Sequence, residues 1–212
     1  MDGKLIIISS PSGGGKGTLI REVRENMPEL GYSVSHTTRP KRPTESNGRE
    51  YFYVTKDEFE QRIADGDFLE YAEVHGNLYG TSLAEIRKVA STGRDLVVEV
   101  DVQGAVQIMD KLPDEAIGIF ILPPSYEILE ARLTSRGTET GELLRMRLAN
   151  AFDEVLDYSH FRYVVVNEDV FSAARQITSI IYAERQRTDR QTEAIKVILD
   201  SFDASKHRFE GE

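Results

Sequence analysis

The beginning of the chain constrains the fold most strongly, because a short apolar run is followed at once by a cluster of glycines and then by a helical pattern. Residues 4–9, Lys-Leu-Ile-Ile-Ile-Ser, are rich in β-branched side chains and predict a buried strand. The glycines of residues 10–18 predict a loop. Residues 19–27 then place apolar side chains at helical spacing, and Pro28 ends the helix. A strand that enters a glycine-rich loop and leaves it as a helix predicts an α/β fold.

The rest of the chain continues this alternation. Three further apolar runs, at residues 96–100, 117–122 and 163–166, predict buried strands. Helical patterns separate or follow these runs, at residues 83–90, 125–136 and 171–187. Strands that alternate with helices predict a parallel, doubly wound sheet. The length of 212 residues fits a single domain of this kind with an insertion.

Two segments interrupt the alternation. Residues 34–82 are aromatic and polar, and Thr55 with Glu58 predicts a capping box at the start of a short helix between antiparallel strands. We interpret this segment as an inserted α+β subdomain; the resemblance described below implies that it binds a nucleotide. Residues 136–148 are rich in glycine and threonine before they become helical; the resemblance described below implies that they form a lid. The core then comprises residues 1–33, 83–135 and 149–212.

Composition and charge exclude several classes of function. The 36 acidic residues outnumber the 26 basic ones and give a formal net charge of -10, with a pI near 5.0. Proteins that bind nucleic-acid polymers or anionic membranes present a basic face, so both partners are disfavoured. The absence of cysteine excludes disulfides and thiolate metal sites and fits a reducing compartment. The apolar run at the N-terminus is too short for a signal peptide, and no other stretch approaches the length of a membrane span. We therefore expect a cytoplasmic protein.

The glycine-rich loop follows the phosphate-binding (P-loop) pattern Gly-x-x-x-x-Gly-Lys-[Ser/Thr] with two departures. Gly15 and Lys16 fit, but Ser10 stands where the first glycine is expected and Gly17 where the hydroxyl is expected. The three consecutive glycines that end at Gly15 can adopt positive φ and direct N–H groups at an anion, and the next helix adds its dipole. Lys16 would reach the outer phosphates of a nucleotide. The alternative, a flexible turn with a solvated lysine, fits the flanking strand and helix less well.

The loss of the hydroxyl at Gly17 bears on metal binding, since that oxygen usually contacts Mg²⁺. The sequence leaves two alternatives open. Either the hydroxyl of Thr18 substitutes for it, or the metal is held mainly by phosphates and water.

A second candidate site lies in the insertion. In residues 35–43, Ser-His-Thr-Thr-Arg-Pro-Lys-Arg-Pro, the prolines stiffen an extended loop that presents Arg39 and Arg42. A guanidinium matches phosphate oxygens in bidentate geometry. The alternative is a basic surface loop without a ligand. Tyr51 and Tyr79 lie nearby in sequence and can also bind phosphate, although aromatic residues in such an insertion more often form its core.

With these residues in place, the chain resembles the guanylate kinases of the bacterial type over nearly its whole length. The resemblance depends on an ordered set of motifs, any one of which alone is weak. They are Pro-Ser-Gly-x-Gly-Lys at 11–16, Ser-x-Thr-Thr-Arg-x-x-Arg at 35–42, Gly-x-x-Tyr-x-x-Val at 48–54, Phe-Leu-Glu-Tyr-Ala at 68–72, Gly-Asn-x-Tyr-Gly-Thr at 76–81, Asp-x-Gln-Gly at 101–104, Ile-Phe-Ile-Leu-Pro-Pro-Ser at 119–125, Arg-Gly-Thr-Glu-Thr at 136–140 and Val-Asn-Glu-Asp at 166–169.

The resemblance implies transfer of the γ-phosphoryl group of ATP to GMP, with Mg²⁺, in purine nucleotide metabolism. It implies catalytic roles for Lys16, Arg39, Arg136 and Arg147. The residues implied for ATP are Ser12, Gly13, Gly14, Gly15, Lys16, Gly17, Thr18 and Asn167. Those implied for GMP are Ser35, Arg39, Arg42, Tyr51, Glu70, Tyr79, Thr81 and Asp101. Within this set Glu70 reads the base, because one carboxylate accepts from both N1–H and the N2 amino group of guanine but faces a bare acceptor in adenine.

Two other functions remain open from the sequence. A different nucleoside monophosphate kinase is the first, since Gly17-Thr18 after the lysine is similar to the loop of adenylate kinases. The second is a protein-binding module, although such modules tend to have a degraded loop and lid. The oligomeric state is also open. A C-terminal helical pattern packs either on the core or on a second subunit, through Ala194, Ile195, Ile198, Leu199 and Phe202.

Overall fold

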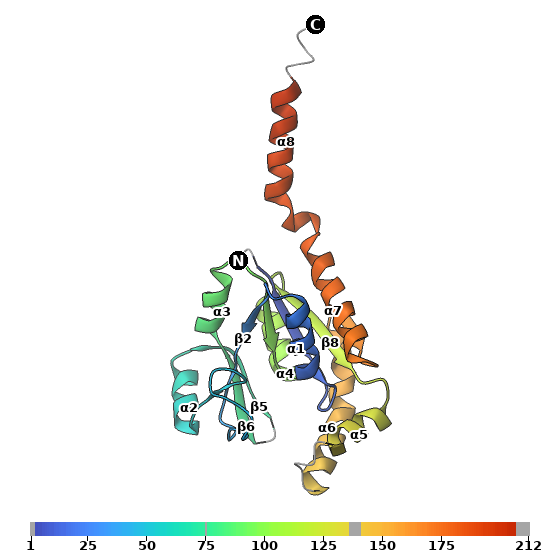
Figure 1. The fold of residues 1–212 in the computed structure, drawn as a ribbon. Coiled ribbons are helices and arrows are strands. Elements are labelled where there is room, and N and C mark those ends of the chain that lie inside the picture. The colour runs from blue at the N-terminus through green and yellow to red at the C-terminus, as the bar shows by residue number, and fades with distance from the viewer. Residues whose placement is uncertain (1–2, 75, 136–140, 207–212) are drawn as a thin grey trace.

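The computed structural model describes residues 3–74, 76–135 and 141–206. Within these ranges, five parallel strands form a central sheet in the order β2-β7-β1-β8-β9 (Figure 1). The strands are β2 (Gly31–Ser33), β7 (Leu96–Glu99), β1 (Leu5–Ser9), β8 (Ala116–Leu122) and β9 (Tyr163–Val166). The central strand is β1, with β7 on one side and β8 on the other, so the strand order reverses around it. Ligands of open α/β sheets bind at such a reversal, beyond the carboxyl ends of the strands.

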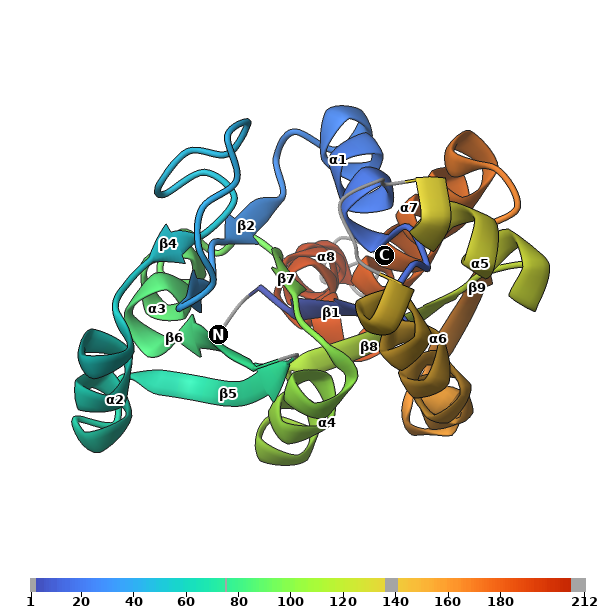
Figure 2. The same cartoon turned by 90° about the horizontal axis from the view of Figure 1, so that it is seen from below.

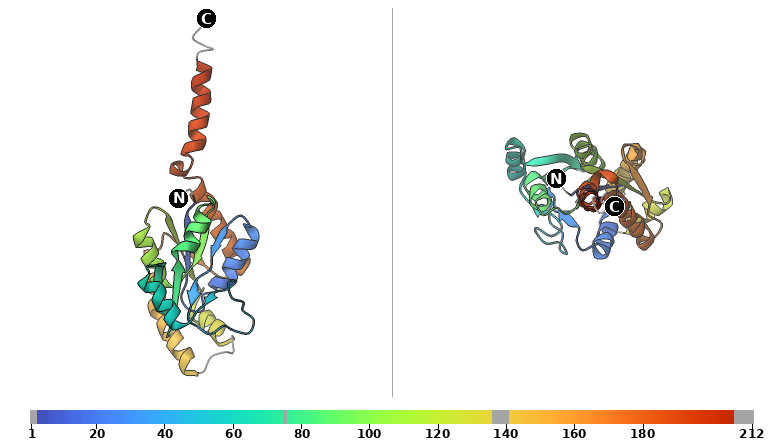
Figure 3. Two further views of the ribbon diagram at one scale, coloured as in Figure 1. Left: turned by 90° about the vertical axis from the view of Figure 1, so that its left-hand side faces the viewer. Right: turned by 90° about the horizontal axis from the view of Figure 1, so that it is seen from above.

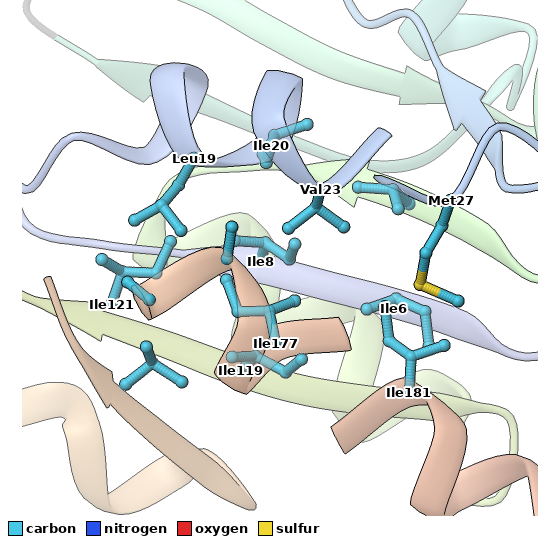
Figure 4. Close-up of a cluster of buried hydrophobic side chains, with 14 of the residues drawn as sticks. Ile6, Ile8, Leu19, Ile20, Val23, Met27, Ile119, Ile121, Ile177 and Ile181 are labelled. Atoms are coloured by element: carbon cyan, nitrogen blue, oxygen red, sulfur yellow. The ribbon is translucent and has the colours of Figure 1, made fainter. Parts of the chain in front are cut away.

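Helices cover both faces of this sheet. Those of one face are α1 (Lys16–Asn26) and α7 (Val170–Arg185), and those of the other are α3 (Leu83–Ala90) and α4 (Val102–Lys111). Side chains of β1 alternate between the two layers, because successive residues of a strand point to opposite faces. Ile6 and Ile8 pack with α1 and α7, as Figure 4 shows, whereas Leu5 and Ile7 pack with α3 and α4. The predicted doubly wound parallel sheet is confirmed.

The insertion between β2 and α3 folds around a second sheet, which has four strands among the described residues. The strands lie in the order β4 (Phe52–Tyr53), β3 (His36–Thr37), β6 (Asn77–Ser82) and β5 (Phe68–Val74), and the helix α2 (Lys56–Ala64) precedes β5. The predicted capping box is confirmed, since Thr55 and Glu58 each accept a hydrogen bond from the other's backbone N–H.

The expected antiparallel pairing of the insertion holds for β5 with β6 and for β3 with β6. It is wrong for β3 and β4, which pair in parallel. The reason is the long segment at residues 38–51, which returns the chain to the start of β3 before β4 begins. In the view of Figure 2, the insertion and the pair α5 (Tyr126–Ser135) and α6 (Gly141–Leu156) lie on opposite sides of the central sheet.

The lid segment was expected at residues 136–148. Residues 136–140 lie outside the described residues, and α6 continues without interruption to Leu156, so this helix does not end where the expected lid ends. A 3-10 helix, η1 (Asp157–His160), then leads into β9. Leu129 and Leu133 of α5 are buried with Ala151 of α6, which holds the two helices together.

The last helix stands away from the rest of the molecule. A 3-10 helix, η2 (Thr188–Arg190), follows α7 and leads to α8 (Thr192–Lys206). Figures 1 and 3 show α8 extending from the end of the sheet at which β1 begins. No helix in the part of the chain that the structure describes is both long and apolar enough to cross a bilayer.

Candidate functional site

The glycine-rich loop connects the carboxyl end of β1 to the first turn of α1. Gly13 and Gly15 have φ values of 88° and 90°, which only glycine adopts readily. A Cβ at Gly15 would also lie 2.5 Å from Nδ2 of Asn167. Gly14 does not have the positive φ that was expected for all three glycines; it is needed instead because a Cβ there would lie 2.9 Å from Cβ of Ser10.

Lys16 begins α1 at the end of this loop. Its Nζ donates a 2.5 Å hydrogen bond to the carbonyl of Val100, which follows β7. The ammonium group therefore lies between the carboxyl ends of β1 and β7, at the reversal of the strand order. Both residues that follow, Gly17 and Thr18, are exposed.

Glu99 is a site residue that the sequence reasoning missed. It ends β7, and its Oε1 would lie 3.6 Å from a Cβ at Gly17, so the carboxylate faces the position where the P-loop pattern has a hydroxyl. Tyr32 donates a 3.0 Å hydrogen bond to Oε2 of Glu99 and fixes its orientation. A signal existed in the sequence, since Glu99 is the polar residue at the carboxyl end of a buried strand.

Asn167 and Arg132 lie beside the glycine-rich loop. Asn167 follows β9, is buried, and donates from Nδ2 to the carbonyl of Gly14 at 2.9 Å. Arg132 of α5 donates from Nη2 to the carbonyl of Asn167 at 2.9 Å. Among the described residues, Oδ1 of Asn167 and Nη1 of Arg132 are buried without a hydrogen-bond partner. Since such atoms are costly to leave unpaired, they point to a polar ligand beside the loop.

The helix α6 contacts the loop through two hydrogen bonds. Nε of Arg147 donates to Oγ of Ser12 at 2.9 Å, and the backbone N–H of Ser12 donates to Oε2 of Glu154 at 2.7 Å. The structure thus brings Arg147 to the phosphate-binding loop. Arg136, the other arginine expected in the lid, lies outside the described residues.

A cluster of charged and aromatic groups surrounds Arg39 in the insertion. Nη2 of Arg39 pairs with Glu45 at 2.9 Å, and the guanidinium carbon lies 5.5 Å from the ring centre of Tyr51. The rings of Tyr51 and Tyr79 meet edge to face with centres 5.7 Å apart. The structure therefore brings together three of the residues expected at the GMP phosphate. Arg42 lies at the border of this cluster, with Nη1 3.9 Å from Glu45.

Glu45, which is not among the residues expected from the sequence, is the acidic partner of this cluster. Burial favours its neutral form, but hydrogen bonds from Arg39, from the backbone N–H of Arg42 and from the hydroxyl of Tyr53 outweigh that effect. They hold the pKa of the carboxyl at about 2. A second anion that binds Arg39 has to compete with this carboxylate.

Glu70 lies in the middle of β5, directly opposite Thr81 of β6. Glu70 is 3 % exposed, and its carboxyl group accepts a 2.5 Å hydrogen bond from Oγ1 of Thr81. Burial raises the pKa of Glu70 to about 7, and the nearby charge of Asp101 adds to the rise while the hydrogen bond from Thr81 opposes it. Asp101 caps α4 by accepting from the N–H groups of Gln103 and Gly104.

Gly104 makes room for this carboxylate, because a Cβ there would lie 2.6 Å from Oε2 of Glu70. Ser35, expected beside the base, is buried just before β3. The structure therefore brings Glu70, Thr81 and Asp101 together where the insertion meets the first turn of α4, and that group can accept hydrogen bonds from a planar donor such as a base edge.

Comparison with known proteins gave concordant results. The family model described as guanylate kinase matches residues 2–184. A guanylate kinase of Neisseria meningitidis serogroup A is 47 % identical over 199 residues, which cover 94 % of this chain and 97 % of the relative. One of Koribacter versatilis is 46 % identical and covers 88 % of this chain and 81 % of the relative. The crystal structure of guanylate kinase from Anaplasma phagocytophilum superposes with a TM-score of 0.75 at 34 % identity, covering 89 % of each chain.

Proposed function

The chain belongs to the guanylate kinase family, which catalyses ATP-dependent phosphorylation of GMP to GDP, and we propose the roles of its own residues in that reaction. The observation that carries the proposal is the buried carboxyl group of Glu70, held beside Thr81 and Asp101 in the insertion. A deeply buried carboxyl with a raised pKa and no cationic hydrogen-bond partner among its described contacts is typical of a binding site. It supports a site that reads a base, separate from the phosphate-binding loop.

ATP would bind at the loop that follows β1. The N–H groups of residues 12–18 and the dipole of α1 favour the phosphates, and Lys16 neutralises their outer charges. The unpaired polar atoms of Asn167 and Arg132 support their assignment to the same nucleotide. Arg132 is an addition to the residues expected from the sequence.

GMP would bind in the insertion. Its phosphate would take the place of Glu45 as the anionic partner of Arg39, with Arg42 and the hydroxyls of Tyr51 and Tyr79 as further donors. Its base would face Glu70, with Ser35, Thr81 and Asp101 alongside. An ionised Glu70 accepts from N1–H and the N2 amino group of guanine, whereas adenine offers an acceptor there and would leave the carboxylate unpaired.

Phosphoryl transfer to GMP needs no general base, because the accepting phosphate oxygen is already ionised at neutral pH. Catalysis then depends on alignment and on neutralisation of charge around the transferred group. Lys16 supplies charge from the loop, Arg39 from the insertion and Arg147 from α6, while Arg136 is assigned to the same role from the sequence. Closure of the insertion and the lid over both substrates would exclude water and prevent hydrolysis of ATP.

The residues at the loop fit a Mg²⁺ ion that takes most of its ligands from phosphates and water. No group of three or more acidic or histidine side chains in the described ranges could hold a metal by itself. Glu99 faces the position of the missing hydroxyl and is oriented by Tyr32, which supports Glu99 as the nearest protein carboxylate to the ion. The hydroxyl of Thr18 stays a second candidate. When bound, the ion offsets negative charge on the β- and γ-phosphates.

We infer a cytoplasmic location from the proposed substrates, because the cell keeps its pools of ATP and GMP in the cytoplasm. The partners of the site are therefore small molecules, and neither nucleic-acid polymers nor membranes.

The test is formation of ADP from ATP, followed in a coupled assay with GMP, AMP and pyrimidine monophosphates as acceptors, with and without Mg²⁺. We expect turnover with GMP that depends on Mg²⁺, and its loss in Lys16→Met and Arg39→Ala with circular dichroism unchanged. Lys88→Met, on the exposed side of α3, is the matched control. Near-normal turnover in Lys16→Met, or a preference for AMP, would contradict these assignments. Absence of both ATP binding and turnover would favour the protein-binding alternative.

A further inference from the structure

A β-bulge lies directly before the carboxyl group that we assign to the base. In the pairing of β5 with β6, Phe68 lies opposite Ser82. Glu70 then lies opposite Thr81, the preceding residue of β6, so Leu69 is an extra residue of β5. In a regular strand, residues two apart point to the same face, and a bulge interrupts that alternation. Phe68 and Glu70 therefore point to opposite faces of the second sheet.

The two faces differ in character. Phe68 stacks on Phe59 of α2, with ring centres 4.6 Å apart, so its face is the apolar side of the insertion. Glu70 faces α4 instead, since its Oε2 would lie 2.6 Å from a Cβ at Gly104. Without the extra residue, the carboxyl group of Glu70 would share the apolar face with Phe68. The bulge therefore directs this carboxyl group into the candidate site.

Side chains of α4 hold the backbone on both sides of Glu70. The strand β5 ends the order of the second sheet, and α4 lies beside it (Figure 2). Nζ of Lys111 donates a 2.6 Å hydrogen bond to the carbonyl of Leu69. Nε2 of Gln107 donates a 3.1 Å hydrogen bond to the carbonyl of Tyr71. The two donors are four residues apart and so lie on one face of the helix, which fixes the edge of the insertion at Glu70.

The extra residue of the bulge is held through its side chain and through its backbone. The side chain of Leu69 is buried in the apolar cluster that includes Val102 and Ile108 of α4, and its carbonyl accepts from Lys111. Lys111 is otherwise an exposed residue in the last turn of α4. A cation there also suits the negative end of the helix dipole, so a purely structural role of Lys111 is the alternative that a test has to separate.

The charge of Lys111 also acts on the carboxyl group of Glu70. Burial is the main cause that raises the pKa of Glu70 to about 7, and the charge of Asp101 adds to the rise. The hydrogen bond from Thr81 of β6 and the charge of Lys111 lower this pKa. Since the ionised carboxylate accepts from both donors of guanine, Lys111 favours the form of Glu70 that the proposed recognition requires.

We propose that Lys111 is a positioning residue for recognition of guanine, because its ammonium group holds the bulge of β5 that directs Glu70 at the base. This inference rests on the function proposed above and adds to it a residue outside the insertion. Lys111 acts through Glu70 and not on the transferred phosphoryl group. Its removal therefore affects KM for GMP, whereas kcat and KM for ATP stay unchanged.

Steady-state kinetics of Lys111→Met and Lys111→Arg test the proposal. At pH 7, Lys111→Met should raise KM for GMP by about threefold or more, the size expected for a contact made by an exposed charge, with kcat within about twofold of wild type. Lys111→Arg should restore KM, since a guanidinium keeps the charge and can donate to the same carbonyl. Lys88→Met, at an exposed lysine of α3, is the matched control. An unchanged KM in Lys111→Met, or no rescue by arginine, would overturn the proposal.

A double-mutant cycle separates positioning from a structural role. If Lys111 acts through Glu70, Lys111→Met should raise KM for GMP less in the Glu70→Gln background than in the wild-type background. The ratio of KM between Lys111→Met and wild type should also be larger at pH 6 than at pH 8, because the titration of GMP itself cancels in this ratio. Equal effects in the two backgrounds, or a ratio that does not depend on pH, would overturn the proposal.

Turnover of the wild-type protein separates this inference from the proposed function. Failure of the wild type to phosphorylate GMP would refute the proposed function and the inference with it. Normal turnover of the wild type, together with a KM for GMP that is the same in Lys111→Met, would refute the inference alone. Circular dichroism of each variant should match that of the wild type, since Lys111 is exposed.

Discussion

Replacement of Glu70 by glutamine should make the protein more stable at alkaline pH while it damages the site. Burial raises the pKa of this carboxyl from the ordinary value of 4.5 to about 7 in the folded protein. The folded state therefore holds the proton more tightly than the unfolded state, and stability falls as pH rises from 4.5 through 7. The difference of 2.5 pKa units corresponds to at most about 3 kcal/mol at pH 8.

The variant Glu70→Gln removes this cost, because glutamine is neutral at every pH and its carbonyl can still accept from Thr81. At pH 8 the free energy of unfolding should rise by up to about 3 kcal/mol, and for a chain of this size that raises the melting temperature by up to about 6–12 °C. At pH 5, where Glu70 is already protonated in the folded state, the gain should be much smaller.

The assay is urea unfolding at pH 5 and pH 8, with the midpoint and slope measured for both proteins. Glu73→Gln is the matched control, since Glu73 is an exposed residue of the same strand. A variant that gains as much stability at pH 5 as at pH 8, or that loses stability at pH 8, would refute the reasoning. Such a gain in the variant would mean that the native protein gives up stability in order to keep an ionisable group in its binding site.

Glu70 also bears on the binding of GMP, and Gly15 and Asp95 offer tests of the loop and of the sheet. Below pH 7 the KM for GMP should rise more steeply in the wild-type protein than in Glu70→Gln, because both share the titration of the GMP phosphate, with a pKa of about 6, and only the wild type adds the titration of Glu70. Identical pH profiles of the two proteins would contradict a role for the ionised carboxylate. Gly15→Ala should lower kcat/KM for ATP at least about 100-fold, because the loop has to shift away from Asn167. Gly66→Ala, also at a positive φ but in open surroundings, should keep normal activity. Asp95 pairs with Arg185 and Arg190, so Asp95→Asn should lower the free energy of unfolding by about 2–3 kcal/mol at pH 7 with kcat unchanged. The loss is smaller than for fully buried pairs because the partner arginines are partly exposed, and an unchanged urea midpoint would contradict it.

The sequence predicts those parts of the fold in which local pattern and final burial agree. The strands β1, β7 and β8 are buried on both sides and are therefore largely apolar, so the sequence predicts each of them. The edge strand β9 is predicted from its apolar residues too, but the expectation that it is buried is wrong for one side, where Val164 and Val166 are exposed. The strand β2 was missed because it has only three residues and begins with glycine, which disfavours strands, and its pairing with β7 makes it a strand. The parallel pairing of β3 with β4 depends on the path of the loop between them, which no local pattern encodes.

The candidate site shows a similar division. Lys16, Gly15 and Arg39 belong to motifs in which the residue type and the spacing carry the chemistry, so the sequence predicts roles for them directly. Glu99 and Glu45 were missed, because a single carboxylate is an ordinary surface residue until its neighbours are known. Their place in the candidate site depends on contacts between segments that are distant in the sequence, such as the hydrogen bond from Tyr32 to Glu99.

Acceptor specificity tests the central claim, that Glu70 selects guanine, most directly. The measurement is kcat/KM for GMP and for AMP in the wild-type protein, in Glu70→Gln and in the control Glu73→Gln. Loss of hydrogen bonds to a charged acceptor, worth about 1.5–3 kcal/mol, predicts a 10- to 150-fold fall for GMP in Glu70→Gln, on the order of the loss of one charged interaction. The value for AMP should not fall, and Glu73→Gln should behave as wild type. An unchanged kcat/KM for GMP in Glu70→Gln, or equal losses for GMP and AMP, would contradict the claim.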